Sequence, residues 1–333
     1  MTMTYRRSGA SGLDLPAISL GLHRTFAADR PPDVRRAVLL RAFDRGVTHL
    51  DTANVYGPPI GHAEEFLGHL LKTDLKPHRD ELTIATKAGI PLWQGRPYGE
   101  GGSRKHLLAS LDASLKRLGL DYVDIFYHHR ADETVPLEET AAALAQTVRC
   151  GKALYIGVSN YPAARTARLA DLLKQERVPL TIAQERYNLL DRRMDQPRDG
   201  SASVIDTLVQ VGAGFAVHSP LDQGRLTGRY LAGVPEGSRA TIDPDVRGRL
   251  TDEYIEVAKQ LTAYANDCGQ RLEQMAVAWL LRHQAVTTVL VGASSVAQLD
   301  ASLDTLGQPE AAAEAFQAIE TLIAAHPDIL TFR

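Results

Sequence analysis

The chain has 333 residues, of which 44% are hydrophobic, and a formal net charge of −3 at pH 7. That length suits one large domain or two smaller ones. The small net charge argues against a surface for nucleic acid or for an anionic membrane. No apolar stretch approaches the roughly 20 residues of a membrane span, and the polar start Met-Thr-Met-Thr-Tyr is unlike a signal peptide. The two cysteines, Cys150 and Cys268, match no metal or redox spacing, so we expect free thiols in a cytoplasmic protein.

Short apolar runs alternate along the chain with longer segments of helical periodicity. The runs that we expect to form strands are Ala17–Leu22, Thr48–Asp51, Leu82–Lys87, Tyr122–His128, Ala153–Ser159, Thr181–Gln184, Gly214–His218 and Thr288–Val291. The segments that we expect to be helical are 33–45, 62–72, 103–118, 136–150, 162–176, 203–211, 254–283 and a final helix at 296–305. Eight successive units without a break in composition predict an α/β protein, a closed (β/α)8 TIM barrel that forms one domain over 1–333.

Three connections are long, at about 88–102, 185–202 and 219–253, and all of them follow strands. They therefore rise from the C-terminal face, where active sites of such barrels are built. Connections of this length in a compact domain are usually functional or disordered. We expect them to be substrate and cofactor loops. Among the turn signals, Asp33 and Ser103 are predicted helix N-caps.

Four polar residues lie at or just after the carboxyl ends of three successive predicted strands. Asp51 and Tyr56 lie in the segment Thr48-His-Leu-Asp-Thr-Ala-Asn-Val-Tyr-Gly57, and Lys87 and His129 end the next two strand segments. Each alone has a plain reading, since Asp51 could cap a helix and Tyr56 could be a loop aromatic. A lysine at the end of an apolar strand, however, would be costly to bury unless it were paired. The combination favours a catalytic site.

A tyrosine with a free pKa of about 10 is too weak an acid for efficient proton donation near neutrality. A nearby ammonium group stabilises the phenolate and lowers that pKa. We therefore predict Tyr56 as proton donor, Lys87 as the group that tunes it, Asp51 as the partner of Lys87, and His129 as the residue that orients a carbonyl. Such a site stabilises an alkoxide but supplies no electrons, so reduction requires a hydride cofactor.

This spacing resembles the catalytic tetrad of the aldo-keto reductase superfamily. The likeness covers nearly the whole chain and extends to Gly157-Val-Ser-Asn160, Ser219-Pro-Leu-Asp-Gln-Gly224 and Val291-Gly-Ala-Ser294. Within the superfamily, Asn54-Val-Tyr-Gly-Pro-Pro-Ile-Gly-His-Ala-Glu-Glu65 and Gly101-Gly-Ser-Arg-Lys105 resemble the branch of the bacterial L-glyceraldehyde 3-phosphate reductases and the potassium-channel β-subunits. The resemblance implies an NADPH-dependent reductase of small aldehydes or ketones, built on a TIM barrel.

The resemblance also implies where NADPH would bind, extended across the barrel mouth. Ser159, Asn160 and Gln184 would hold the nicotinamide amide, and Arg229 and Arg239 would lie near the phosphates. Helix N-terminal amides favour an anion, and such amides would meet the adenosine phosphate. The further residues implied around the cofactor are His218, Ser219, Pro220, Leu221, Gln223, Gly224, Gly292, Ser294, Ser295 and Gln298.

Several positions depart from the family pattern. His218 stands where an aromatic residue usually stacks on the nicotinamide, and Asp222 stands where an alanine is common. Ser295 replaces an arginine that meets the 2′-phosphate, and the expected Glu-Asn pair is absent from the stretch Asp300–Ser302. We therefore hypothesise a relaxed preference for NADPH, with NADH also used.

Other candidates remain open at this point. Adjacent strand residues point to opposite faces, so one of the pair His128 and His129 is expected to reach the site; the family match selects His129, and His128 is then a packed histidine. Trp93 and Tyr98 are predicted to form a substrate wall, or else to anchor their loop. Four arginines are weaker candidates for a substrate phosphate, because solvated arginines are common: Arg104, Arg130, Arg186 and Arg192.

Two competing functions come from other classes. The first is a binding subunit that senses its nicotinamide cofactor with little turnover, as in the channel-associated branch. The second is a metal-dependent barrel hydrolase, which is disfavoured because no His-x-His pair follows the first strand. We predict no bound metal and no nucleic-acid or membrane partner. Assembly into a homo-oligomer is suggested by analogy with the closest branch alone.

Overall fold

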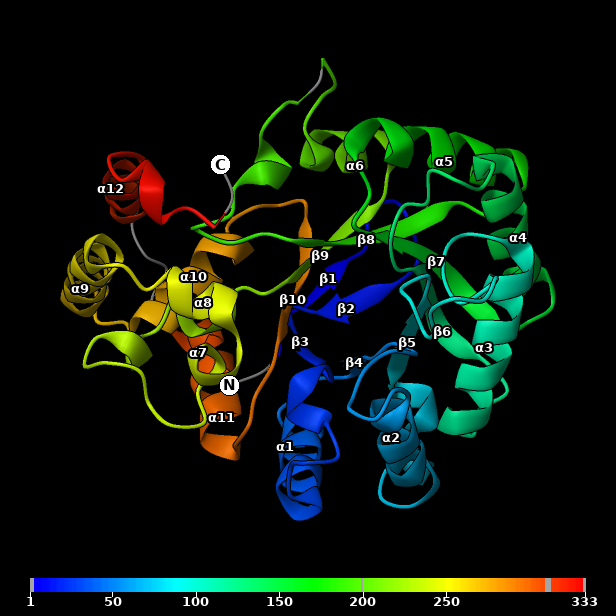
Figure 1. The fold of residues 1–333 in the computed structure, drawn as a ribbon, viewed down its shortest axis with the longest axis horizontal. Coiled ribbons are helices and arrows are strands. Elements are labelled where there is room, and N and C mark those ends of the chain that lie inside the picture. Colours follow the sequence, from blue (N-terminus) through cyan, green and yellow to red (C-terminus); the bar gives the residue numbers. More distant parts are fainter. Residues whose placement is uncertain (1–2, 199, 309–312, 332–333) are drawn as a thin grey trace.

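The computed structural model describes residues 3–198, 200–308 and 313–331. Eight parallel strands close into a barrel in the order β10-β3-β4-β5-β6-β7-β8-β9 (Figure 1). The barrel strands are β3 (Ile18–Gly21), β4 (His49–Asp51), β5 (Thr83–Ala88), β6 (Val123–His128), β7 (Ala153–Ser159), β8 (Leu180–Arg186), β9 (Gly214–His218) and β10 (Val286–Val291). The predicted (β/α)8 TIM barrel is therefore confirmed.

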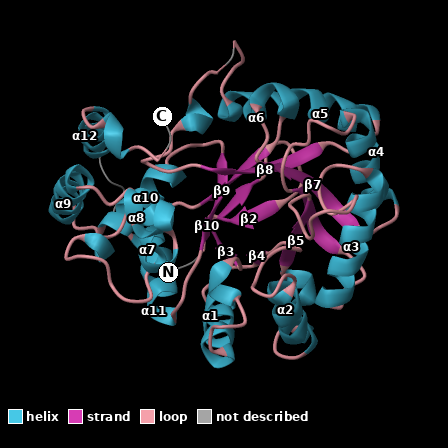
Figure 2. Cartoon of the chain, viewed as in Figure 1, coloured by secondary structure: helices cyan, strands magenta, loops and turns pink. Residues whose placement is uncertain are grey.

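Helices surround the strands in a continuous outer layer (Figure 2). Those that follow the barrel strands are α1 (Pro32–Asp44), α2 (His62–Lys72), α3 (Arg104–Leu118), α4 (Leu137–Arg149), α5 (Ala163–Gln175), α6 (Val204–Val211), α10 (Leu272–Leu281) and α11 (Val296–Leu303). Four others are α7 (Arg239–Ile242), α8 (Pro244–Gly248), α9 (Asp252–Asp267) and α12 (Ala313–Ala324). Of the predicted caps, Ser103 is confirmed, since its side chain accepts from the His106 amide, whereas Asp33 lies inside α1, which Pro31 precedes.

Alternation along the strands decides which side chains enter the barrel. In β5, Ala85 and Lys87 point inward, while Ile84 and Ala88 belong to the layer between strands and helices. The inner core is small and is formed by residues from both the barrel and the chain's start: Leu13, Leu15, Ala85, Ile125, Tyr127, Ile182 and Ala216. The polar residues at the carboxyl ends of the strands therefore lie next to this apolar inner core.

One helix prediction at the carboxyl end is wrong, and one helix was overlooked. The predicted helix at 254–283 is two helices, α9 and α10, because Gly269 adopts the left-handed conformation between them (φ 71°). The helix predicted to end at 305 ends at Leu303 and continues as a 3-10 turn. It is followed by α12, whose buried Phe316, Ile319 and Ile323 show the helical spacing that the prediction overlooked.

An antiparallel hairpin, β1 (Tyr5–Arg7) and β2 (Asp14–Pro16), was not predicted. Its strands have three residues each, which is too short for a periodicity signal. Ser8 bonds the Thr181 carbonyl at the start of β8, and Leu15 enters the inner core. The hairpin thus closes the amino-terminal end of the barrel, which leaves the opposite end open.

The long connections rise from the C-terminal face, as predicted, and 219–253 contains α7 and α8. Cys150 and Cys268 are free thiols. Within the described ranges, no helix has the length and hydropathy needed to cross a membrane.

Candidate functional site

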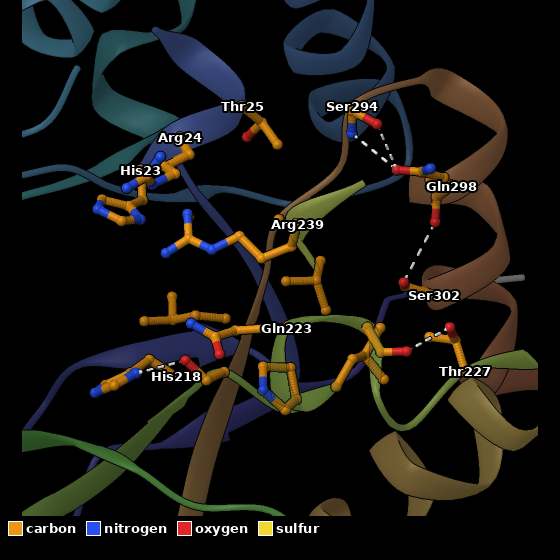
Figure 3. Close-up of a pocket in the computed structure, with 18 of the residues that line it drawn as sticks. His23, Arg24, Thr25, His218, Gln223, Thr227, Arg239, Ser294, Gln298 and Ser302 are labelled. Atoms are coloured by element: carbon orange, nitrogen blue, oxygen red, sulfur yellow. Dashed lines mark hydrogen bonds between the residues drawn. The ribbon is translucent and has the colours of Figure 1, made fainter. Parts of the chain in front are cut away.

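A cavity of about 1040 Å³ opens at the C-terminal end of the barrel. It runs from Asp51, Tyr56 and His129 at one end to Ser294 and Gln298, beside α11, at the other. Ligand pockets commonly enclose about 300–1,000 Å³, so this cavity can hold a ligand of dinucleotide size. Figure 3 shows residues from the two ends converging on it, with His23 and His218 at one end and Ser294 and Gln298 at the other.

Lys87 and Asp51 form a buried ion pair at the floor of the cavity. The Lys87 ammonium donates to both carboxylate oxygens of Asp51, at 2.7 and 2.6 Å, and to the Thr52 carbonyl at 2.8 Å. Gln184 Nε2 donates to the same carboxylate at 2.8 Å. Lys87 is fully buried and does not line the cavity itself. The pairing that sequence reasoning predicted for Lys87 and Asp51 is therefore present, with all three ammonium donors accounted for.

Tyr56 lies beside this pair and lines the cavity. Its backbone is held by a turn to Ala53 and by the Ala63 amide, and Lys87 Nζ lies 4.9 Å from the centre of its ring. Burial raises the pKa of Tyr56 well above its usual value, and the negative charge of Asp51 raises it further. The predicted lowering of this pKa by Lys87 is not found, because burial above all, and then the Asp51 charge, raise it. The phenol consequently keeps its proton at neutral pH.

His129 and His128 separate as strand alternation requires. His129 follows Ile125 and Tyr127 on the inner face and lines the cavity, with its ring 5.9 Å from that of Tyr56. His128 points outward and its Nδ1 bonds the Tyr161 hydroxyl at 2.5 Å, which fits the packed role predicted for it.

Burial and the Lys87 charge lower the pKa of His129 well below its usual value, so the ring is neutral at pH 7. Its Nδ1 atom is buried without a partner in the part of the chain that the structure describes. Only Nε2 can therefore reach a ligand in the cavity. A neutral imidazole with the proton on Nε2 can donate one hydrogen bond to a carbonyl oxygen.

His23 is a site residue that sequence reasoning missed. It follows β3, lines the cavity, and packs edge-on against Tyr56 with ring centres 4.7 Å apart. Burial and the neighbouring Arg24 lower the pKa of His23 to about 4, so it too is neutral at pH 7. Its position just after the first barrel strand was the available signal, because the predicted catalytic residues also lie at strand ends.

The residues predicted to bind the coenzyme lie around this cavity with one exception. The lining residues among them are Ser159, Asn160, Gln184, His218, Ser219, Pro220, Leu221, Gln223, Gly224, Arg229, Arg239, Gly292, Ser294 and Gln298. Ser295 does not line it, because its hydroxyl caps α11 by accepting from the Gln298 amide at 3.2 Å. The placement brings together segments at or after four barrel strands, β7, β8, β9 and β10.

Asn160 connects the coenzyme residues to the catalytic end. Its Nδ2 atom donates to the His129 carbonyl at 2.9 Å and to Ser159 Oγ at 3.0 Å. His218 Nδ1 lies 3.1 Å from Ser219 Oγ, and burial together with Arg186 lowers the pKa of His218 to about 3. A neutral imidazole stands therefore at the position where the resemblance implies stacking on the nicotinamide.

The far end of the cavity is built from exposed and half-buried side chains. Gln298 Oε1 accepts from the Ser294 amide at 3.0 Å and from Ser294 Oγ at 2.8 Å (Figure 3). Arg271, between α9 and α10, donates to the Ala301 carbonyl at 3.3 Å and pairs with Glu273 at 3.2 Å. Arg271 and Glu273 both line the cavity, and neither was predicted from the sequence.

The arginines that line the cavity are not the four considered for a substrate phosphate. Arg186 bonds Asp222, Arg192 bonds Asp195, and Arg104 bonds Gln146; like Arg130, none of them lines the cavity. The cavity is lined instead by Arg24, Arg30, Arg229, Arg239 and Arg271. Arg229 and Arg239 were implied by the resemblance, whereas Arg24, Arg30 and Arg271 were not predicted.

Trp93 and Tyr98 do not line the cavity and are each about half exposed, at 48% and 47%. Their loop folds on itself through a bond from the Leu92 amide to the Gly99 carbonyl, and Lys105 stacks on the Tyr98 ring at 4.4 Å. This arrangement matches the loop-anchor alternative. The apolar residues that do line the catalytic end, Val55 and Ile90, were missed.

Among the described residues, no group of three or more His, Cys, Asp or Glu side chains is arranged to hold a metal ion. The ionisable groups at the catalytic end are instead an ion pair, a phenol and neutral imidazoles. The size of the cavity and the amides of Asn160 and Gln184 fit a nicotinamide coenzyme.

The family model for the aldo/keto reductase family matches residues 17–324. The L-glyceraldehyde 3-phosphate reductase of Escherichia coli O157:H7 is 49% identical over 327 residues, which cover 97% of this chain and 93% of that protein. The enzyme of the same name from Escherichia coli strain K12 is 50% identical over 309 residues, covering 91% and 88%. A potassium channel β-subunit-like protein of Schizosaccharomyces pombe is 35% identical over 335 residues, covering 98% and 91%. Aldo/keto reductases use nicotinamide cofactors. The chain belongs to the aldo/keto reductase family and is an oxidoreductase that acts on carbonyl groups.

Proposed function

We propose that the protein reduces small aldehydes or ketones to alcohols, reversibly, with Tyr56 as general acid and NADPH as its main coenzyme. One observation carries this proposal: a protonated Tyr56 lines the cavity beside His129 and directly above the buried Lys87–Asp51 pair. A nicotinamide coenzyme bound in the cavity supplies the hydride.

The chain's own residues divide the remaining work. Nε2 of His129 orients the carbonyl oxygen by donating a hydrogen bond, and Tyr56 gives its proton to that oxygen as negative charge develops. The raised pKa of Tyr56 is compatible with this role, because an alkoxide is a stronger base than a phenolate. Lys87 stabilises the negative charge left on the phenol, and Asp51 keeps Lys87 charged and in place.

For the coenzyme, we propose that NADPH is preferred over NADH only moderately. The site for a 2′-phosphate lacks an arginine at Ser295, whose hydroxyl caps a helix. Arg271 reaches the same end of the cavity from another element, but Glu273 pairs with it and also lines the cavity. A carboxylate at this end accepts hydrogen bonds from a ribose hydroxyl and opposes a phosphate. A ratio of catalytic efficiencies above about a thousandfold, ~4 kcal/mol, would contradict the proposal.

For the substrate, we propose a small aldehyde that carries an anionic group. The relatives from Escherichia coli are named for L-glyceraldehyde 3-phosphate, which is such an aldehyde. Arg24 lines the cavity next to His23, and His23 contacts Tyr56, so a positive charge is available near the catalytic end. Guanidinium groups bind phosphate well.

The test is NADPH and NADH oxidation with a panel of aldehydes and ketones, comparing wild type with Tyr56→Phe. Phenylalanine keeps the ring and removes the acid, so kcat should fall at least about a hundredfold while coenzyme binding persists. Tyr122→Phe is the matched control. Tyr122 precedes the amino-terminal end of β6, whereas the cavity opens at the carboxyl ends of the strands. Equal turnover in Tyr56→Phe and wild type would refute the role of Tyr56. Tight coenzyme binding without turnover by wild type would favour the sensing subunit.

A further inference from the structure

The loop of residues 219–224, which we call the coenzyme loop, has an unusual backbone. Ser219, Asp222 and Gln223 all lie in the left-handed region, with φ of 56°, 43° and 60°. Non-glycine residues adopt this conformation rarely, and it persists where the surroundings hold it. Five of the six residues of the loop line the cavity, and Asp222 is the exception. Its side chain is completely buried on the other side of the loop.

The carboxylate of Asp222 is a node of buried hydrogen bonds. Oδ1 accepts from Arg186 Nη2, while Oδ2 accepts from Arg225 Nη1 at 2.9 Å and from Thr331 Oγ1 at 2.6 Å. A buried carboxylate with several charge-assisted bonds is held in one orientation. None of these partners lines the cavity. Asp222 therefore contributes to the shape of the coenzyme loop rather than to contact with a ligand.

The same node fastens residues 329–331, which we call the C-terminal latch. Arg225 Nη2 donates to the Ile329 carbonyl at 2.6 Å, and Arg225 Nη1 donates to Thr331 Oγ1 at 3.2 Å. The Thr331 amide donates to the Leu190 carbonyl at 2.8 Å, in the connection after β8. The latch is thus bonded to the underside of the coenzyme loop and to the adjoining connection.

Other contacts hold the loop from its remaining sides. Asn188 Nδ2 donates to the Ser219 carbonyl at 2.9 Å, and Arg249 Nη2 donates to Gln223 Oε1 at 3.0 Å. These bonds leave Asp222 as the residue through which the middle of the loop meets the latch. The Thr331 hydroxyl is itself uncharged, and Asp222 keeps Arg186 and Arg225 as partners without it, so the hydroxyl can be removed without leaving a buried charge unpaired.

We propose that Asp222 is a positioning residue and that the C-terminal latch, acting through it, holds the coenzyme loop in the shape that binds the coenzyme. This inference rests on the proposed coenzyme site. It predicts that the latch controls coenzyme affinity from the far side of the loop, without contact with the coenzyme and without a part in proton transfer.

The decisive comparison is Thr331→Val against Thr331→Ser in the full-length protein. Valine keeps the shape and removes the hydroxyl, whereas serine keeps the hydroxyl. Thr331→Val removes the bond to Asp222 and the longer bond from Arg225, and it should raise the Kd for NADPH about tenfold, the size expected for loss of hydrogen bonding to a charged group. Thr331→Ser should stay within about twofold of wild type. At saturating coenzyme, kcat and its pH profile should be unchanged in both, because the residues at the reacting atoms are untouched.

Controls separate this role from a general loss of stability. Thr321→Val removes a hydroxyl that bonds Gln317 within α12 and should leave the Kd unchanged. Asp222→Asn, which removes the charge at the node, should raise the Kd more than Thr331→Val; if it does not fold, the two Thr331 variants decide. The latch is ruled out if Thr331→Val binds NADPH like wild type, or if Thr331→Ser weakens binding equally. If wild type itself binds no nicotinamide coenzyme, the proposed function fails as well, which distinguishes the two failures.

Discussion

The two ends of the cavity are built in different ways. At the catalytic end, Lys87, Asp51 and Gln184 are buried and bond one another, so their geometry exists before any ligand arrives. At the adenosine end, Arg271 and Glu273 are partly exposed, at 52% and 22% of their side chains, and lie on the turn and first residues of one helix. Preorganised groups suit charge stabilisation during a reaction. Exposed pairs can exchange partners, which suits a choice between two coenzymes.

Removing Lys87 tests whether the catalytic end is preorganised by its ion pair. Lys87→Met leaves the Asp51 carboxylate buried without its cation, so the free energy of unfolding should fall by about 3–5 kcal/mol. Carbonyl reduction should be lost with it. Urea unfolding measures the first effect and coenzyme oxidation the second. Lys105→Met, at an exposed position on α3, is the control and should change stability by less than about 0.5 kcal/mol. A stable Lys87→Met variant would mean that the pair contributes little.

A buried histidine near the catalytic end, His49, predicts that the stability of the fold is sensitive to acid. His49, completely buried and 2.9 Å from Ser19 Oγ, has its pKa lowered by burial to about 4. Below a pH of about 6.5 the unfolded chain takes up a proton on this residue that the folded protein excludes. The stability is therefore complete above that pH and falls as the pH drops towards about 4.

The corresponding measurement is the free energy of unfolding of wild type and His49→Gln at pH 7 and pH 4.5. Wild type should lose about 2 kcal/mol more than the variant over this interval, because only wild type carries the excluded proton site. Equal losses in the two proteins would show that His49 is not held neutral by the fold.

The smallest expected effect is at the adenosine end. Arg271→Ala should lower the catalytic efficiency with NADPH up to about fivefold and leave that with NADH within about twofold, since an exposed charge contributes about 1 kcal/mol or less. Glu273→Gln should shift the preference in the opposite direction, because it frees Arg271 for a phosphate. Parallel losses with both coenzymes in Arg271→Ala would assign Arg271 a structural role and would remove the proposed contrast between the ends.

Much of the site followed from local pattern. A period of two implies that only one of His128 and His129 reaches the inner face, and the family resemblance selected His129; the ends of parallel strands meet at one face of a barrel. The expected effect of Lys87 on the Tyr56 pKa was wrong because it depended on where Asp51 lies and on burial, which are properties of the packed structure. The positions of Trp93 and Tyr98 also depend on the packed structure, because the periodicity of a sequence does not predict the path of a long loop.

By itself, the sequence determined the barrel, the identity of the strand-end residues and the pairing of Lys87 with Asp51, because these depend on periodicity and on the cost of burying an unpaired charge. The tertiary structure decided which residues meet in the cavity and behind it: His23 against Tyr56 and Arg271 beside Ala301 in the cavity, and Thr331 on Asp222 behind it. These pairs are separated by 33, 30 and 109 positions. Contacts between such distant segments form only when the barrel closes, so local patterns in the sequence do not predict them.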